Sequence, residues 1–378
     1  MTYRREELDL LSPSPGTRQS LVLHRFGRPG SAPKAYIQAS MHADEIPAMM
    51  AAHHLLQLLA EAEKGGLVTG EIVLIPYANP IGLAQWVNDD HLGRHELRGG
   101  GNFNRDWPNL EPAVLAAVEG KLTQDPLQNV SLIRTALLAA LKQRRIRHTL
   151  DSLKHSLMAE SITADYVLDL HCDDNALLHL YTLPQHWAEI GDLAAELGAE
   201  VVLTDPGGPG GAFDEANSHP WIAVQERFPD HPIPAACFST TVELRGEADV
   251  SDALGSQDAG AIFRYLVRRG LIGGATAAAP ELKCGPTEID ACAVLRAPAA
   301  GILAYQVALG DQVTAGQVIA ELIDPAADPG AERQAIRAEA PGLVFNLLAG
   351  KYVQAHHPIA KIAGKERTGA HLAYTGED

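Results

Sequence analysis

Residues 34–45 read KAYIQASMHADE, an apolar run with strand-forming residues that ends in a histidine and two carboxylates. The first half predicts a buried strand, and the helical periodicity that begins at residue 46 predicts a helix directly after it. His42, Asp44 and Glu45 therefore stand at the expected mouth of a buried strand, where titratable groups must be solvated, paired or bound to a ligand. One interpretation is a solvated turn that caps the helix. The other is that His42 and Glu45 hold a metal ion.

The same alternation of apolar runs and helical patterns continues through the first 270 residues. The expected strands are 21–26, 34–39, 71–77, 165–171, 200–204 and 235–243, and the expected helices cover about 46–62, 131–146, 186–198 and 258–269. This order predicts an α/β domain whose mixed sheet is flanked by helices. The stretch DPGGPGGA (205–212) lacks the Lys-Ser/Thr ending of a phosphate loop and a clear following helix, so we expect a flexible loop near the site.

A second unit is expected after a linker at residues 270–280. Residues 297–323 and 340–363 form a near-repeat, which predicts two interlocked β-hairpin units. The matched pairs are Gly301 and Gly342, Gly310 and Gly350, Val313 and Val353, and Ile319 and Ile359. The pattern resembles the barrel-sandwich hybrid of lipoyl and biotinyl domains, but the connector between the halves has no lysine, so a covering or oligomerising module is predicted instead of a carrier. The predicted domains are 1–275 and 285–368.

The composition excludes several classes of protein. The chain has 378 residues, of which 47 are acidic and 30 basic, giving a net charge of −17 that argues against nucleic-acid or anionic-membrane partners. Its four cysteines form no CxxC pair, which fits reduced thiols. The charged N-terminus has no apolar segment, and no apolar run approaches the roughly 20 residues of a membrane span. We therefore expect a cytoplasmic enzyme or binding protein.

A third metal ligand is expected far along the chain, because a catalytic zinc site needs three protein ligands and one open position. The run DYVLDLHCDD (165–174) places His171 at the end of an apolar strand. Asp169 faces the same side of that strand and could orient the imidazole. A histidine alone in such a place is more often a satisfied core residue, but together with His42 and Glu45 the metal interpretation is favoured.

Two other segments carry charged groups at expected loops or strand ends. RGGGNFNRDWP (98–108) places Arg98 and Arg105 on one glycine-rich loop, where guanidinium groups suit a carboxylate or an oxyanion, although surface charges are the simpler alternative. CFSTTVELRGEAD (237–249) places Glu243 at a strand end. Its carboxylate could take a proton from metal-bound water, or simply pair with Arg245.

Taken in chain order, H-x-x-E after a strand, Asn-Arg followed by aromatic-Pro, DLH at a strand end and T-V-E-L resemble one known family. This is the succinylglutamate desuccinylase/aspartoacylase branch of the zinc carboxypeptidase-like superfamily. The resemblance covers about residues 15–270, and the C-terminal β-module also occurs in this branch. It implies a zinc-carboxypeptidase-like α/β fold, with zinc held by His42, Glu45 and His171 and with Glu243 as general base and later acid.

The resemblance also implies roles for the glycine-rich loop. Asn104 and Arg105 match the pair that grips a substrate carboxylate, and Arg98 matches the arginine that polarises the scissile carbonyl, with Arg94 as the alternative. Ala43 and Arg245 stand where relatives often have glycine. Ala43 should spare the site, whereas Arg245 is expected to change the shape or charge of the pocket.

The function implied is a zinc-dependent hydrolase that removes the acyl group from a small, carboxylate-bearing N-acylated amino acid or related amine. Two alternatives stay open: a metallocarboxypeptidase that trims short peptides, and a non-catalytic protein that binds zinc or an acyl-amino acid. The sequence does not specify the acyl group, the amine, or whether the chain forms a homo-oligomer.

Overall fold

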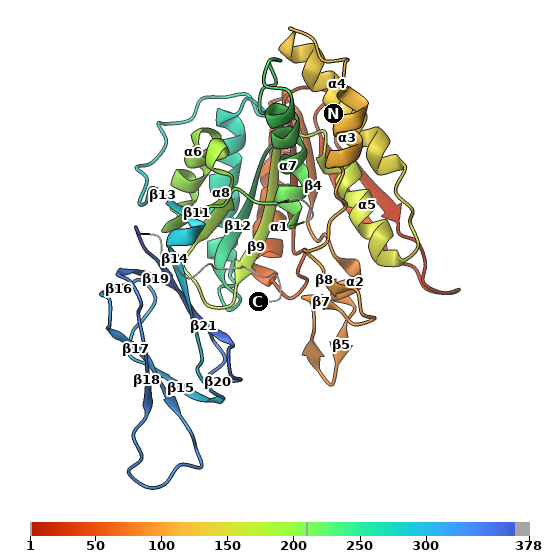
Figure 1. Cartoon of the computed structure of the whole chain (residues 1–378). Helices are drawn as coiled ribbons and strands as arrows, with labels where there is room; N and C mark the ends of the chain where they lie inside the picture. Colours follow the sequence, from red (N-terminus) through yellow and green to blue (C-terminus); the bar gives the residue numbers. More distant parts are fainter. Residues whose placement is uncertain (1, 209–210, 367–378) are drawn as a thin grey trace.

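The computed structural model describes residues 2–208 and 211–366, and its centre is one large mixed sheet with a small β-module below it (Figure 1). The sheet has nine strands in the spatial order β1-β2-β4-β3-β9-β12-β10-β11-β13. In chain order these are β1 (Arg4–Asp9), β2 (Ser20–Phe26), β3 (Lys34–Ala39), β4 (Glu71–Ile75), β9 (Tyr166–Asp173), β10 (His179–Thr182), β11 (Val201–Thr204), β12 (Phe238–Gly246) and β13 (Pro286–Glu288). All six strands expected from the apolar runs are present.

The four central strands β4, β3, β9 and β12 run parallel to one another, while β2 and β10 run antiparallel to their neighbours β4 and β12. The central strands are buried on both faces, which explains their nearly continuous apolar sequences. In β3, Tyr36 packs into one core and Ile37 into the other. Strands β1, β10 and β13 were not predicted, because β1 is a charged edge strand and β10 and β13 have only four and three residues.

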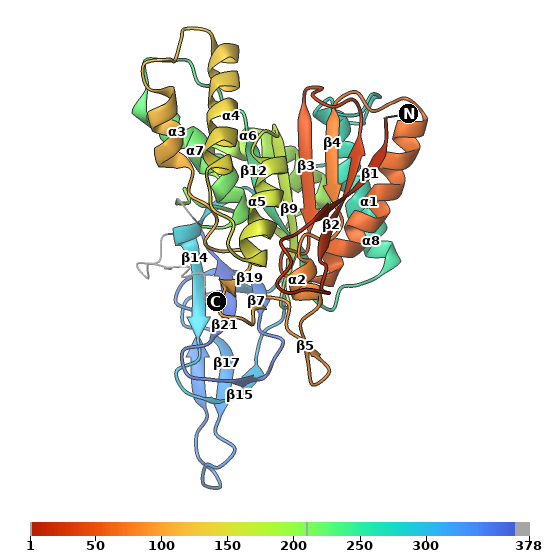
Figure 2. The same cartoon turned by 90° about the vertical axis from the view of Figure 1, so that its right-hand side faces the viewer.

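Helices cover both faces of the sheet, as Figure 2 shows. On one face lie α1 (Ile46–Lys64), α6 (Trp187–Leu197) and α8 (Asp252–Arg268), and on the other lie α3 (Glu111–Val118), α4 (Pro126–Lys142), α5 (Thr149–Ser161) and α7 (Phe213–Arg227). Short elements complete the domain: α2 (Pro80–Leu83), η1 (Pro184–His186), η2 (Ile289–Ala291), and the hairpins β5 (Trp86–Val87) with β6 (Asp90–His91) and β7 (His95–Glu96) with β8 (Gly101–Asn102). The four predicted helices correspond to α1, α4, α6 and α8.

The expectation that no helix follows the stretch 205–212 was wrong, because α7 begins at Phe213. This helix is buried on most of its surface and contains Pro220, so its sequence lacks the regular alternation of apolar and polar residues that marks a surface helix. Residues 209 and 210 of the stretch lie outside the described residues.

The C-terminal module consists of two four-stranded antiparallel sheets, β14-β21-β19-β16 and β18-β17-β15-β20. Its strands are β14 (Cys292–Arg296), β15 (Gly301–Tyr305), β16 (Gln312–Val313), β17 (Val318–Ile323), β18 (Gln334–Arg337), β19 (Gly342–Leu347), β20 (Tyr352–Val353) and β21 (Pro358–Ala363). Each sheet takes strands from both halves of the repeat. Gly301 of the first half pairs with Val353 of the second, and Gly342 of the second half pairs with Val313 of the first. The two halves therefore make the same pairing, once in each sheet. The interlocking predicted from the repeat is confirmed.

The module contacts the segment that follows β9. The Leu177 N–H donates to the Phe345 carbonyl oxygen at 2.8 Å, and the Leu347 N–H donates to the Asn175 carbonyl oxygen at 3.0 Å. Phe345 is fully buried against Val201 and neighbouring apolar residues. The predicted module range also includes β13, which joins the large sheet beside β11, and residues 367–368, which lie outside the described residues.

Within the described residues, no helix combines the length and apolar character that a bilayer span requires. All four cysteines fall in this part of the chain and none forms a disulfide.

Candidate active site

The turn after β3 carries two of the expected ligands and is tied to the strand that carries the third. Ser40 has a positive φ of 57°, which turns the chain out of the strand. Its N–H donates to the Leu170 carbonyl oxygen at 3.1 Å, and its hydroxyl donates to the Glu45 carbonyl oxygen at 2.8 Å. The turn that holds His42 and Glu45 is therefore fixed against β9, next to His171.

Glycine allows a second loop to pack against this turn. The Ala43 N–H donates to the Gly93 carbonyl oxygen at 3.0 Å, and a Cβ on Gly93 would lie 2.2 Å from the Asp44 nitrogen. Ala43 itself is fully buried against Gly82, where a Cβ would be 2.8 Å from the alanine methyl. The alanine at this position is thus accommodated by a neighbouring glycine.

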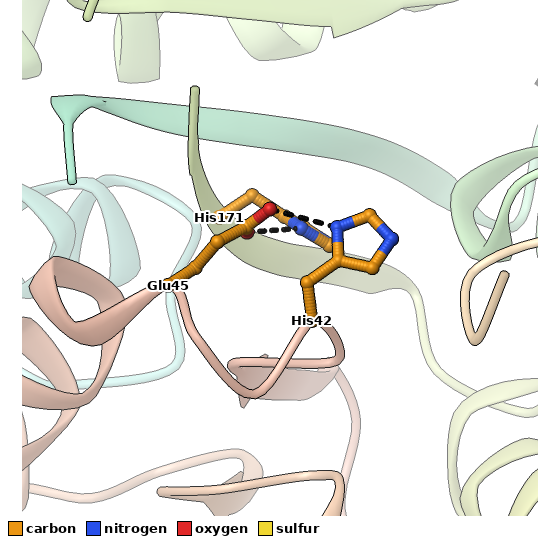
Figure 3. A group of neighbouring side chains, drawn as sticks. All are labelled: His42, Glu45 and His171. Atoms are coloured by element: carbon orange, nitrogen blue, oxygen red, sulfur yellow. Dashed lines mark hydrogen bonds and ion pairs between the residues drawn. The ribbon is translucent and has the colours of Figure 1, made fainter. Parts of the chain in front are cut away.

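His42, Glu45 and His171 form one buried cluster, shown in Figure 3. The Nδ1 atoms of His42 and His171 lie 2.7 Å from the two carboxylate oxygens of Glu45, Oε1 and Oε2 respectively. One donor atom from each residue lies within 4.8 Å of the others, and this group could hold a metal ion. Two imidazole nitrogens and one carboxylate oxygen are a donor set that suits a tetrahedral divalent ion with one open position.

The second ring nitrogen of each imidazole, Nε2, also has an acceptor beside it. His42 Nε2 lies 2.8 Å from Asn102 Oδ1, and His171 Nε2 lies 2.9 Å from Asp169 Oδ2. Such acceptors fix the tautomer and the orientation of a ligating ring. Asp169 takes the orienting place that its position on the strand predicted, whereas Asn102 was not singled out from the sequence.

Burial and neighbouring charges act in opposite directions on the pKa values of this cluster. Burial disfavours the charged form of His171, but the carboxylates of Asp169 and Glu45 raise its pKa well above the usual value. For His42, burial dominates and lowers the pKa. Burial would raise the pKa of Glu45, yet His171 and His42 hold it well below its usual value. Glu45 is accordingly ionised, as a metal ligand must be.

Glu243 lies beside His171 on the neighbouring strand β12, because the two residues are paired in register. Its Oε2 atom is buried and has no hydrogen-bond partner among the described residues. Burial, followed by the nearby charge of Glu45, raises the pKa of Glu243 to about 8. Arg245 does not pair with Glu243, since its guanidinium donates to Asp258 instead. Glu243 lines the same cavity as His42, Glu45 and His171.

These residues line a cavity of about 280 Å³. Arg94 and Arg105 lie on its wall, and Arg94 Nη1 donates to Glu45 Oε1 at 3.3 Å. Asn104 also lines the cavity, but its side-chain oxygen accepts the Trp107 indole N–H and the Phe213 N–H, and its Nδ2 lies 3.3 Å from Asp169. Its amide is thus engaged in holding the surrounding structure.

Arg98 lies elsewhere. It lines a second, larger cavity and does not line the one that contains the cluster, whereas the alternative, Arg94, contacts the cluster directly. The sequence also gave no indication of Asp214 and Glu215, which line the active cavity from the first turn of α7. They could not be found without recognising that helix.

Comparison with known proteins agrees with this geometry. The sequence model of the succinylglutamate desuccinylase/aspartoacylase catalytic domain matches residues 31–267. No curated protein matches the chain.

Among solved structures, a succinylglutamate desuccinylase/aspartoacylase family protein from Shewanella amazonensis SB2B has a TM-score of 0.82 at 24% identity, over 95% of this chain and 98% of that one. A protein described in the same terms from Shewanella frigidimarina NCIMB 400 has a TM-score of 0.82 at 25% identity, over 96% and 97%. The product-bound ectoine utilization protein EutE (DoeB) from Ruegeria pomeroyi has a TM-score of 0.67 at 16% identity, over 96% and 95%. These likenesses extend through the C-terminal module. With its mixed sheet, its His-Glu-His cluster and a match over residues 31–267, the chain belongs to the succinylglutamate desuccinylase/aspartoacylase family.

Proposed function

We propose that this protein is a zinc-dependent hydrolase that cleaves the amide bond of a small N-acylated amino acid or related amine. The observation that carries the proposal is the placement of Glu243 beside a buried His42-Glu45-His171 group in one cavity. Zinc is the ion of choice, because two imidazoles and a carboxylate with an open fourth position are a donor set of catalytic zinc sites. Bound there, zinc would supply a Lewis acid that lowers the pKa of water and polarises a carbonyl.

Glu243 acts as the proton carrier in this proposal. Glu243 lines the cavity next to His171, so its carboxylate would accept the proton of the attacking water and return it to the departing amine. A pKa raised from the ordinary carboxyl range toward neutrality suits a group that accepts a proton and later donates it, and burial raises the pKa of Glu243 in this direction.

The two arginines on the cavity wall would bind the substrate. Arg94, which lies 3.3 Å from Glu45, would stabilise the developing oxyanion, the role that the family resemblance gave to Arg98. Arg105 would hold the substrate carboxylate and so orient the scissile bond. Asn104 supports this arrangement by contacting Asp169 and the backbone of Phe213.

The test combines metal analysis with a panel of N-acetyl, N-succinyl and N-formyl amino acids and dipeptides, scored for released amine. We expect about one zinc per chain and hydrolysis of an N-acyl amino acid. Glu243→Gln should keep the metal and lose at least about 100-fold in kcat. Glu226→Gln, on the exposed side of α7, is the matched control and should behave as the unaltered protein. A metal-free preparation, or full activity of Glu243→Gln, would rule out the mechanism, and a preference for dipeptides would favour a carboxypeptidase.

A further inference from the structure

The cavity that contains Arg98 has features of a second binding site. Its volume is about 870 Å³. Its walls include the N-terminal segment at residues 11–13, the hairpins β5–β6 and β7–β8, the loop 144–148 that joins α4 to α5, and the first half of α5. None of the three residues of the metal cluster lines it.

Unpaired arginines gather on its wall. Among the described residues, five arginine side chains make neither an ion pair nor a hydrogen bond, and four of them line this cavity. These four are Arg98, Arg144, Arg145 and Arg147, and the fifth is Arg28. In a chain with 47 acidic and 30 basic residues, carboxylate partners are plentiful. Guanidinium groups stay charged at any physiological pH, so leaving four of them unneutralised in one place favours an external anion.

Three carboxylates line the same wall, those of Glu96, Asp106 and Asp151, and two of them accept hydrogen bonds from backbone groups. Glu96 accepts the Gly100 N–H at 2.9 Å, and Asp151 accepts the N–H groups of Arg147 and His148 at 2.9 and 3.1 Å. Their hydrogen bonds hold the backbone of the two loops that carry the arginines. Lys154, a further cation of the wall, donates to the Arg105 carbonyl oxygen.

The three glycines after Arg98 explain how the hairpin reaches this cavity. Gly99 and Gly101 have φ values of +92° and +75°, which side chains rarely adopt, and a Cβ on Gly100 would lie 2.8 Å from Leu150. The turn of the β7–β8 hairpin thus packs against α5. Arg98 then lines the same cavity as the loop 144–148. The base of the same hairpin carries Arg94 and Asn102, which contact the metal cluster, so the second cavity is structurally linked to the first.

The rest of the wall includes a flat apolar surface. The Trp86 side chain is 63% exposed and stacks on His91, with ring centroids 4.8 Å apart and an interplanar angle of 15°. An exposed indole that is already held in place offers a stacking surface for an aromatic ligand at low entropic cost.

We propose that this cavity binds a small anion that carries two or more phosphate groups, with the phosphates held by Arg98, Arg144, Arg145 and Arg147. Separate guanidinium groups can each make bidentate hydrogen bonds to phosphate oxygens, and an oligophosphate brings several charges into one small volume. Two kinds of ligand carry such phosphate groups, an inorganic oligophosphate and a nucleotide. Trp86 distinguishes them, because only a nucleotide has an aromatic base that can stack on the indole. The proposal is independent of the reaction at the metal cluster.

The experiment is calorimetric titration of the purified full-length protein with sodium tripolyphosphate, ATP and citrate at low ionic strength. We expect one oligophosphate per chain, bound at least about tenfold more tightly than citrate, with affinity falling as salt is added. The double variant Arg144→Gln/Arg145→Gln should weaken binding by at least about tenfold. Arg28→Gln, the unpaired arginine outside the cavity, is the matched control and should bind as the unaltered protein does.

Trp86→Ala separates the two sources. A nucleotide site predicts weaker ATP binding with unchanged tripolyphosphate binding, and an inorganic site predicts no change for either anion. Circular dichroism of each variant confirms that it is folded. The proposal is overturned by an absence of binding at millimolar anion, by citrate binding as tightly as tripolyphosphate, or by equal affinities in the double variant and in Arg28→Gln.

Discussion

Two carboxylates close to His171, that of Glu45, which is buried, and that of Asp173, which is largely buried, are stabilised in different ways. Glu45 lies between the imidazoles of His42 and His171, and its neighbouring guanidinium, that of Arg94, is 36% exposed and 3.3 Å away. Asp173, two residues beyond His171 on β9, instead accepts a hydrogen bond from Lys361 Nζ at 2.7 Å. That pair is largely buried, with side chains 13% and 19% exposed for Lys361 and Asp173.

The neighbours of the two carboxylates differ in whether they can ligate a metal ion. Those of Glu45 can, whereas Asp173 forms a structural ion pair. Glu45 is surrounded by nitrogen donors that can themselves ligate a cation, whereas Asp173 receives a permanent ammonium group from β21 of the C-terminal module. The ammonium fixes the end of the strand that carries His171. We infer that the module supports the geometry of the His42-Glu45-His171 cluster.

The largest effect should separate these two carboxylates. Glu45→Gln removes the charged ligand, so we expect metal affinity to fall by at least about 100-fold and hydrolysis to fall to background. Asp173→Asn should keep its metal, because the three donors remain in place. Zinc content after dialysis against a weak chelator measures both. Equal metal loss in the two variants would contradict the distinction between a ligand and a structural carboxylate.

Lys361→Met should have the next largest effect. Removing the ammonium leaves Asp173 charged and largely buried, and breaking such a pair costs about 3 kcal/mol in the free energy of unfolding. Urea unfolding measures the loss. The double variant Lys361→Met/Asp173→Asn is the control, since it removes both charges, and we expect it to be more stable than the sum of the single changes predicts. Strict additivity would mean that the two groups do not interact.

Phe345→Leu should have a smaller effect on the same interface. Phe345 is fully buried, and its ring centroid lies 5.0 Å from that of His179. Leucine keeps most of the apolar contact but loses the aromatic pair, so we expect a cost of about 1 kcal/mol. Limited proteolysis of the segment between β13 and β14 reports whether the module is released more often. A cleavage rate equal to that of the unaltered protein would show that this ring does not hold the module.

Sequence patterns predicted the features whose causes are local. The central strands are buried on both faces and so have continuous apolar runs, and the paired glycines of the repeat, such as Gly301 and Gly342, mark where equivalent strands begin. His42, Glu45 and His171 could be proposed together because the first two lie in the turn after one such strand and the third lies near the end of another. The sheet then brings them to one edge, as parallel strands do.

Features that depend on the packing of distant segments could not be predicted. Which arginine of the β7–β8 hairpin reaches the cluster depends on three-dimensional turn geometry, so Arg98 and Arg94 could not be distinguished by spacing. Asn102 contacts His42, which is 60 residues away in the chain, and Lys361 contacts Asp173, which is 188 residues away. No local pattern distinguishes Lys361 from an exposed lysine.

The smallest effect is expected at the position of the repeat that is equivalent to Lys361. Ile319 matches Ile359, so Glu321 on β17 occupies the place in the first half that Lys361 occupies in the second. Glu321 pairs with Arg333 at 3.0 Å, but the side chains are 34% and 54% exposed. Glu321→Gln should therefore change the free energy of unfolding by no more than about 0.5 kcal/mol, measured by the same urea titration. Both positions lie on equivalent strands. If Lys361→Met lowers the free energy of unfolding strongly and Glu321→Gln barely changes it, the loss comes from the contact between Lys361 and Asp173. A loss of similar size at Glu321 would instead assign it to the folding of the module itself.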